Sequence, residues 1–536
     1  MHGVAVEASL KLTSLPYTIG KHPFLKIMTN SLKWFPAPLL LIALISILGL
    51  SGIPQVQYPN FARASPISLG KVPLDSSDPM ALPGRDYDHA TVAINSDLDV
   101  VVAFHSSRTD VSASMKQVEI AYYQWQVGDT WLHKGTKTLG NMNFDPLFST
   151  ARVKCERPDV VAVNDKFFVV WTRRYENLST HTNQPAVMEC AWVDFDQQSQ
   201  TIRVHQNGQA LGLGVELDKH ILSGGNDFWV KECGGVPDAV PLKDTGNPYK
   251  VAVVYVHQTQ FSGATLNRKF QLRVVTCELN STTFAVTKGT AQPQGVLVPQ
   301  IQFNGISSAS GSSGGLILPE VAVSSEDNAF WLAAERQIEV GAAKDPEGKI
   351  YLGYWKFESG AWTEKATRTY QSAISGDAYS RRRPMISAYP EAGQNDIVAL
   401  TFNKIDLRQP PVLTSKDVIY KQVEYDPSGS LGTPTTAIPQ WPNSTTHDDL
   451  KPSPIQGRST AAMARAYAGR SQVGGTTQDL INNQGTVVDT SVHITGARPA
   501  LSYYYEPSSA SPDYTAITWE KKLTSGGQLQ VWVGVE

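Results

Sequence analysis

The sequence predicts an all-β fold, a six-bladed β-propeller with four short strands in each blade. The main observation is a pattern that occurs six times: a proline and a β-branched apolar run, a gap, and a second apolar run that ends in an aromatic residue. The segments between the copies show almost no helical period, and 41 glycines and 33 prolines suit a chain rich in turns. A single pair of such strands cannot bury its own apolar face, so the copies are expected to pack against one another.

The clearest copy begins at Arg157-Pro158-Asp159, continues through residues 160–163, and has a second run, residues 167–171, that ends in a tryptophan. The other copies are anchored at His89, where the proline is missing, and at Pro237, Pro319, Pro384 and Pro499. A third strand follows each aromatic residue, and hairpins to a fourth strand are visible in residues 123–131 and 354–362. Four strands in each of six units are typical of a six-bladed propeller.

The predicted propeller spans residues 65–536 and needs one strand from its N-terminal side. The sixth copy has only three strands before Glu536, so residues 67–74 are expected to close the ring as a fourth strand and to cover two sheet edges. Residues 426–496, between the fifth and sixth copies, are interpreted as a long insertion, and residues 459–468 inside it predict a helix. This insertion is either a lid over the central funnel or an excursion on the surface.

Residues 1–64 have the features of a secretory leader. Lysines precede an apolar run at residues 37–50, and Ala62-Arg63-Ala64 fits a small-x-small cleavage site. The apolar run is shorter than the roughly 20 residues that span a bilayer. A signal peptide is therefore predicted, with an uncleaved transmembrane helix through residues 37–53 as the alternative. Both place the propeller outside the cytoplasm, either secreted or anchored to the membrane at its N-terminus.

The composition excludes some classes of protein. The formal net charge is −3 and no basic stripe with interleaved aromatic residues occurs, so no nucleic-acid partner is expected. We find no glycine-rich phosphate loop, no histidine-rich cluster and no Ser/His/Asp arrangement, and the sequence therefore predicts no cofactor and no metal site.

The four cysteines occupy related positions in two adjacent repeats. One cysteine precedes the first strand of each repeat and one lies on its third strand, which predicts the disulfides Cys155–Cys190 and Cys233–Cys277. Loops of this size, about 35 and 44 residues, would each contribute roughly 3 to 4 kcal/mol. A structural zinc site is the alternative, but the paired spacing that such sites use is missing.

Two sets of side chains are expected to converge on one funnel. In a four-stranded blade the innermost strand lines the channel, and its entry lies on the face where the second strand ends. The first set flanks the inner prolines: Arg157, Arg383 and Arg498 before them, and Asp159, Asp238 and Glu320 after them. The second set ends the second strands: Trp171, Arg174, Trp331, Glu335, Arg336 and Trp519.

These residue types suit a carboxylated or polyhydroxylated ligand. Arginine offers a planar pair of donors to a carboxylate, carboxylates accept from sugar hydroxyls, and indole faces stack on sugar rings. The alternative is that the arginines and aspartates pair with one another and only tie the strand entries together.

The repeated pattern, seen in residues 319–323 and 167–171, resembles the sialidase-like (BNR-type) six-bladed β-propeller superfamily over roughly residues 85–536. The resemblance implies an exported protein that binds or cleaves glycans. In the enzymes of this superfamily three arginines clamp the sugar carboxylate, and a tyrosine activated by a glutamate attacks the sugar. Arg157, Arg383 and Arg498 are the positions for such a clamp. Clear Asp boxes are absent, and the catalytic pair is matched only by residue type, at Tyr503, Tyr504, Tyr505 and Glu506.

We therefore expect an exported propeller that recognises an extracellular glycan, or another anionic ligand, in its central funnel. The first alternative is an active, exo-sialidase-like glycoside hydrolase. The second is a scaffold that binds protein partners.

Overall fold

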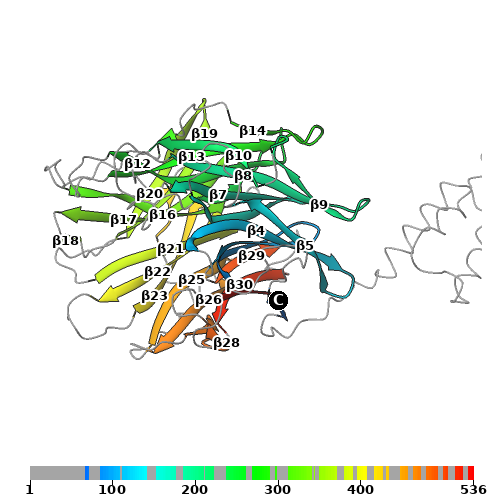
Figure 1. Cartoon of the computed structure of the whole chain (residues 1–536). Helices are drawn as coiled ribbons and strands as arrows, with labels where there is room; N and C mark the ends of the chain where they lie inside the picture. Colours follow the sequence, from blue (N-terminus) through cyan, green and yellow to red (C-terminus); the bar gives the residue numbers. More distant parts are fainter. Residues whose placement is uncertain are drawn as a thin grey trace, which may run out of the picture. The chain divides into compact units, whose positions relative to one another are not determined.

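A computed structural model describes the strands of the chain and their close connections (Figure 1). The described residues are 67–71, 85–108, 112–141, 152–176, 185–209, 212–221, 237–260, 269–289, 296–297, 312–340, 343–344, 349–370, 379–389, 395–406, 416–426, 430–433, 447–456, 463–472, 478–492, 499–504, 514–522 and 529–536. Residues 65–536 form one compact unit. The predicted leader, with its apolar run at residues 37–50 and the alternative anchor at 37–53, lies outside the described residues. Where the chain is described, no helix is long and apolar enough to cross a membrane.

Within these ranges every element is a strand, and the fold is all-β with a propeller-like arrangement. Antiparallel pairing sorts the described strands into seven groups, apart from one bridge, Val492–Lys521, that joins the sixth group to the seventh. The first four groups are as follows. The first group is β2 (Arg85–Ile94), β3 (Val100–Arg108), β4 (Ser112–Gln126) and β5 (Thr130–Gly140). The second is β6 (Arg152–Val163), β7 (Lys166–Glu176), β8 (Pro185–Asp196), β9 (Thr201–His205) and β10 (Val215–Ile221). The third is β11 (Asp238–Pro241), β12 (Lys250–Gln260), β13 (Lys269–Leu279), β14 (Val286–Lys288) and β15 (Val296–Leu297). The fourth is β16 (Ser312–Val323), β17 (Ala329–Val340), β18 (Ala343–Lys344), β19 (Lys349–Glu358) and β20 (Ala361–Tyr370).

The remaining strands complete the series. The fifth group is β21 (Tyr379–Tyr389), β22 (Asp396–Asp406), β23 (Lys416–Asp426) and β24 (Ser430–Leu431). The sixth is β25 (His447–Gln456), β26 (Met463–Gln472), β27 (Gln478–Asn482) and β28 (Val487–Val492). The seventh is β29 (Ala500–Tyr504), β30 (Tyr514–Lys522) and β31 (Leu529–Val535), with β1 (Ile67–Lys71) paired antiparallel to β31.

The apolar core lies between neighbouring groups, as the β-branched runs predict. One cluster contains Ile120 of the first group and Val169 of the second, and another contains Val170 of the second and Val253 of the third. The faces of a strand alternate, so one group contributes to two clusters at once. The third and fourth groups, and the fourth and fifth, share clusters in the same way.

The last group packs against the first. Val100 and Val102 of β3 share a buried cluster with Ala516 of β30 and Val533 of β31. Figure 1 shows the same relationship, because the red strands at the C-terminal end lie beside the blue strands of the first group. The groups therefore follow one another around a centre and return to the start.

The segment predicted as an insertion, residues 426–496, contains the whole sixth group of strands. The helix expected at residues 459–468 is wrong where the structure describes it, because β26 begins at Met463 and pairs with both β25 and β27. Ala466, Tyr467 and Ala468 are all buried, so both faces of this strand are covered. Alanine favours a helix by itself, but pairing on two sides outweighs that preference. Six blades are thus not confirmed.

The predicted disulfide Cys155–Cys190 is not formed, and Cys155, Cys190 and Cys277 are free and buried. Cys155 belongs to the cluster shared with the first group, whereas Cys190 belongs to the cluster shared with the third. The two side chains therefore lie on opposite sides of one sheet. The sulfur of Cys190 instead lies 3.8 Å from the sulfur of Cys277. Cys233, the other half of the second predicted disulfide, is outside the described residues.

Candidate functional site

The inner strands of all seven groups line one central cavity of about 690 Å³. The residues around it come from β2, the strand entry at Pro237 with β11, and the further inner strands β6, β16, β21, β25 and β29. Ser453 and Pro454, from the segment predicted as an insertion, stand in this ring beside the predicted prolines. The cavity is the candidate functional site because copies of the repeated motif from different inner strands line it together.

The arginine–proline motif forms a bulge in the inner strand. In β6 the register with β7 shifts between Glu156 and Asp159, and in β21 the register with β22 shifts between Arg382 and Met385. Equivalent shifts occur in β2, β16 and β25. The first extra residue has a positive φ in four of the described strands: His89 (52°), Arg157 (54°), Leu318 (50°) and Arg383 (54°). Such a backbone costs a non-glycine residue roughly 1–2 kcal/mol, so each bulge needs support from its surroundings.

That support comes from the preceding group. The backbone amide of His89 donates to Glu520 Oε1 at 2.7 Å, and the amide of Arg383 donates to Glu335 Oε2 at 3.0 Å. The amide of Arg157 donates to His105 Nδ1 at 3.3 Å. Each acceptor lies on a second strand and is buried. The second strands therefore hold these three bulges of the next group in place.

Two aspartates tie successive inner strands in a similar way. Asp159 Oδ2 accepts a hydrogen bond from the amide of Ala239 at 2.8 Å, and Asp238 accepts one from the amide of Val321. Burial raises the pKa of Asp159 to about 6. Burial, together with the charges of Asp159 and Glu320, raises the pKa of Asp238 well above its usual range. Three carboxyl groups thus share one side of the cavity, and burial favours the protonated forms of Asp159 and Asp238.

The predicted arginines differ in where the structure places them. Arg157 and Arg383 line the cavity, the first half-buried and the second exposed. Arg498 lies outside the described residues. Arg174 and Arg336 are placed by their backbones on β7 and β17, opposite Ala186 and Lys349. The structure therefore brings two of the three clamp arginines to one cavity.

The predicted tryptophans are core residues and not stacking platforms at the cavity. Trp171, Trp331 and Trp519 are at most 2% exposed, and none is among the described residues that line the cavity. Their indole nitrogens donate to Glu189 (3.0 Å), Asp396 (2.9 Å) and Asp489 (2.8 Å) respectively. All three side chains are buried in apolar clusters between two groups, so in this structure their rings are not open to the cavity. Glu335 is likewise buried, and it holds the Arg383 amide.

His89 lines the cavity, although the sequence marks it only as a repeat anchor and not as a site residue. Its ring stacks on His105 at 4.6 Å between centroids. His105 directly follows the aromatic residue of its strand, the position from which site residues are predicted in other repeats. Tyr503, which the sequence matches to a catalytic tyrosine by residue type, also lines the cavity, where its hydroxyl donates to the Ala388 carbonyl at 2.8 Å. Burial raises the pKa of Tyr503, which disfavours the phenolate that a nucleophile would need.

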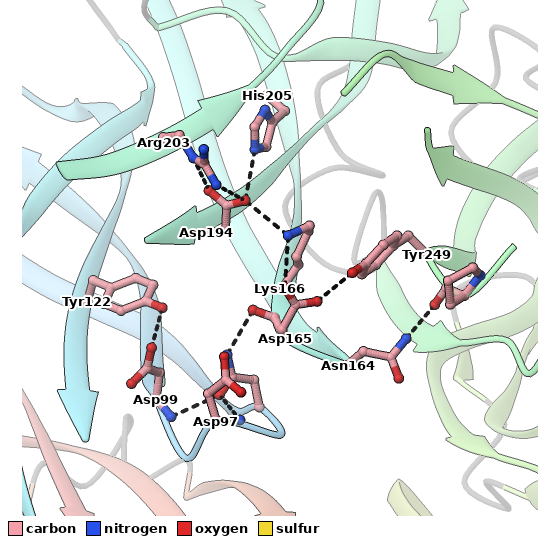
Figure 2. Close-up of polar contacts among 12 residues, drawn as sticks. Asp97, Asp99, Tyr122, Asn164, Asp165, Lys166, Asp194, Arg203, His205 and Tyr249 are labelled. Carbon is pink, nitrogen blue, oxygen red and sulfur yellow. Dashed lines mark hydrogen bonds and ion pairs between the residues drawn. The ribbon is translucent and has the colours of Figure 1, made fainter. Parts of the chain in front are cut away.

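A second polar cluster joins the first three groups away from the cavity lining (Figure 2). Lys166 lies between Asp165 (3.0 Å) and Asp194 (3.1 Å), and Arg203 and His205 also bind Asp194. Burial opposes ionisation of Asp194, but the hydrogen bonds from His205 and Arg203 outweigh it and hold its pKa well below the usual range. Tyr249 of the third group donates to Asp165 at 2.6 Å. Opposite charges balance here, so we interpret the cluster as a structural tie between groups.

Fold and cavity together define an all-β protein with a propeller-like arrangement and a central cavity of mixed polarity. No family model matches the chain, and no curated protein matches it. Among solved structures it is similar to a Dyadobacter fermentans protein of unknown function (8% identity, 88% of this chain and 98% of that chain, TM-score 0.37). It is also similar to a Penicillium chrysogenum α-L-arabinanase complexed with arabinobiose (10%, 88% and 97%, 0.36). A third is the Trypanosoma rangeli sialidase in complex with the inhibitor DANA (12%, 84% and 55%, 0.35). At these values we carry neither their ligands nor their activities over to this chain.

Proposed function

We propose that this protein is an exported, sialidase-like propeller that recognises a glycan, or another anionic extracellular ligand, in its central cavity. Each strand group would be one blade, giving seven, and β1 would be the fourth strand of the last blade. Residues 1–64 would direct export as a signal peptide or anchor. The observation that supports the proposal best is that Arg157 and Arg383, on different inner strands, line the same cavity as three carboxyl groups.

This arrangement suits a ligand that carries both an anionic group and hydroxyls. A guanidinium can donate two parallel hydrogen bonds to a carboxylate, and carboxyl oxygens can accept from sugar hydroxyls. A volume of about 690 Å³ falls in the range of small-ligand pockets. The bulges fix both arginine backbones through buried acceptors, so a ligand would meet a prearranged site.

Glycoside hydrolysis is the second candidate, and Asp159 favours it as a proton donor. Asp238 hydrogen-bonds Asp159 and is therefore too close to be the second catalytic carboxyl group, since a glycosidase pair is about 5 Å or more apart. Hydrolysis of a glycosidic bond commonly needs one protonated and one ionised carboxyl group. The raised pKa of Asp159, about 6, leaves this group divided between the two forms near neutral pH. Both carboxyl groups, however, also accept hydrogen bonds from backbone amides and so stabilise the inner strands. For this reason recognition without turnover remains our first proposal.

The test is a binding screen of the full chain against acidic and neutral oligosaccharides, combined with turnover of a fluorogenic sialoside. The key variant is Arg383→Asn, because asparagine tolerates a positive φ and removes only the guanidinium. Loss of a charge-assisted hydrogen bond costs about 1.5–3 kcal/mol, so affinity for an acidic glycan should fall roughly 10- to 100-fold.

Lys137→Ala is the matched control, since Lys137 is an exposed cation on β5. It should bind as the native chain does. Turnover that disappears in Asp159→Asn would establish the hydrolase instead. Equal affinity of the native chain and Arg383→Asn for every acidic glycan would contradict recognition by the cavity arginines.

A further inference from the structure

Two thiols meet at the boundary between the second and third strand groups. Cys190 lies on β8 and Cys277 on β13, and their sulfur atoms are 3.8 Å apart. Both residues are completely buried, within the apolar cluster that the two groups share. The contact joins positions separated by 87 residues in the sequence.

The backbones of both cysteines are held firmly. Cys190 pairs with Val170 on one side and Val215 on the other. Cys277 pairs with Val251 and Lys288. A disulfide has a sulfur–sulfur distance of about 2.05 Å, so the two sulfurs must approach by less than 2 Å. Side-chain rotation can supply such a movement without breaking the four strand pairs.

We propose that Cys190 and Cys277 form a disulfide that covalently ties the second group to the third. The oxidant is a low-molecular-weight disulfide such as oxidised glutathione, or the disulfide form of a thiol oxidoreductase. One cysteine thiolate attacks it and forms a mixed disulfide, with release of one thiol. The second cysteine thiolate then attacks the mixed disulfide at the protein sulfur and releases the other thiol. Two protein thiols are oxidised, and one oxidant disulfide is reduced to two thiols.

Burial determines when this bond can form. An oxidant has no access to two thiols with no exposed surface in the completed fold. Burial also raises the pKa of Cys190 well above its usual range, so the reactive thiolate is scarce once the groups have packed. The bond therefore forms while the second and third groups come together, and hardly at all afterwards.

The test refolds the reduced full chain with and without oxidised glutathione. Each sample is alkylated under denaturing conditions, digested and examined by mass spectrometry. We expect peptides of Cys190 and Cys277 to be linked only when the oxidant is present during folding, with Cys155 alkylated in every sample. The cross-linked sample should melt up to about 5 °C above the reduced one, since the loop is long but the folded unit is large.

Two controls are added: oxidant supplied after folding, and variants of single cysteines. Oxidant added to the folded, reduced chain should leave both thiols free. In Cys155→Ser, the matched control, the cross-link and the difference in melting temperature should persist, whereas Cys190→Ser should lose both. Linkage of Cys277 to Cys233, or complete alkylation of Cys190 after oxidative refolding, would overturn the proposal. Because the native chain is itself compared with and without oxidant, a variant that fails to fold does not decide the result.

Discussion

Glu335 of β17 accepts a hydrogen bond from the backbone amide of Arg383 on β21, at 3.0 Å. One group thereby fixes the bulge that places the arginine of the next group at the cavity. Arg383 has a φ of 54°, a conformation that its surroundings must stabilise. The cavity lining and the packing of the groups are thus linked through one buried carboxylate.

The first prediction concerns Glu335→Ala. The change leaves a buried backbone amide without its acceptor, which costs about 1–3 kcal/mol, and the free energy of unfolding should fall by that amount. Urea denaturation measures it. Glu358→Ala is the control, since the side chain of Glu358 is 40% exposed and pairs with Lys365, itself 32% exposed. The control should change stability by less than about 0.5 kcal/mol. Equal losses in the two variants would show that Glu335 does not support the bulge.

The second prediction concerns Asp159 and pH. Its pKa in the folded chain, about 6, is above the ordinary value of 3.8 because the group is buried. The folded state therefore binds the proton more tightly than the unfolded state, and stability should decline as pH rises from about 4 to about 6. Asp159→Asn removes this group, so the decline should shrink by about 1–3 kcal/mol.

The measurement is the free energy of unfolding at pH 4, 5, 6 and 7 for both chains. Asparagine keeps an oxygen that can accept from the Ala239 amide, so the tie between strands survives the change. Asp238 lies beside Asp159, and the transition therefore belongs to the pair. Parallel pH profiles for the native chain and the variant would contradict the shifted pKa.

The sequence predicts the repeating unit well because its signal is local. The proline and the β-branched run mark the inner strand, and Arg157 and Arg383, which belong to this motif, line the cavity. The sixth group was missed because its second strand, Met463–Gln472, is rich in alanine and ends in polar residues. Only pairing with strands on both sides makes this segment a strand.

The roles of individual side chains depend on which face of a strand a neighbouring group covers. That neighbour is distant in the sequence, so the local pattern does not predict it. Trp171 ends an apolar run and looked exposed to the funnel, but the sheet turns its ring into the core. The disulfide prediction failed for the same reason. Cys155 and Cys190 belong to one group but face opposite neighbours, and the partner of Cys190 comes from the next group.

The third prediction tests the tyrosine nucleophile that the resemblance to sialidases implies. Tyr503 lines the cavity, but burial raises its pKa and its hydroxyl donates to the Ala388 carbonyl. Tyr503→Phe should therefore lose about 0.5–1.5 kcal/mol of stability and keep its ligand affinity within about threefold. Calorimetric titration with the best glycan from the screen measures the affinity. Loss of a sialoside turnover that the native chain possesses would restore Tyr503 as the nucleophile.

The fourth prediction concerns Asp194, whose carboxylate contacts the side chains of Lys166, Arg203 and His205 (Figure 2). Its pKa is lowered in the folded chain, so the stability it contributes is present above its ordinary pKa of 3.8 and is lost as pH falls below that value.

Asp194→Asn should cost about 2–4 kcal/mol at pH 7, because Lys166 is largely buried and loses one of its two carboxylate partners. The penalty should shrink towards pH 3, because the carboxyl of the unfolded chain is then mostly protonated while that of the folded chain, with its lowered pKa, is still ionised. Denaturation of both chains at pH 7 and pH 3 measures this difference, and Asp196→Asn, at the exposed neighbour of Arg203, is the control. A penalty that is the same at both pH values would mean that Asp194 acts through its shape and not through its charge.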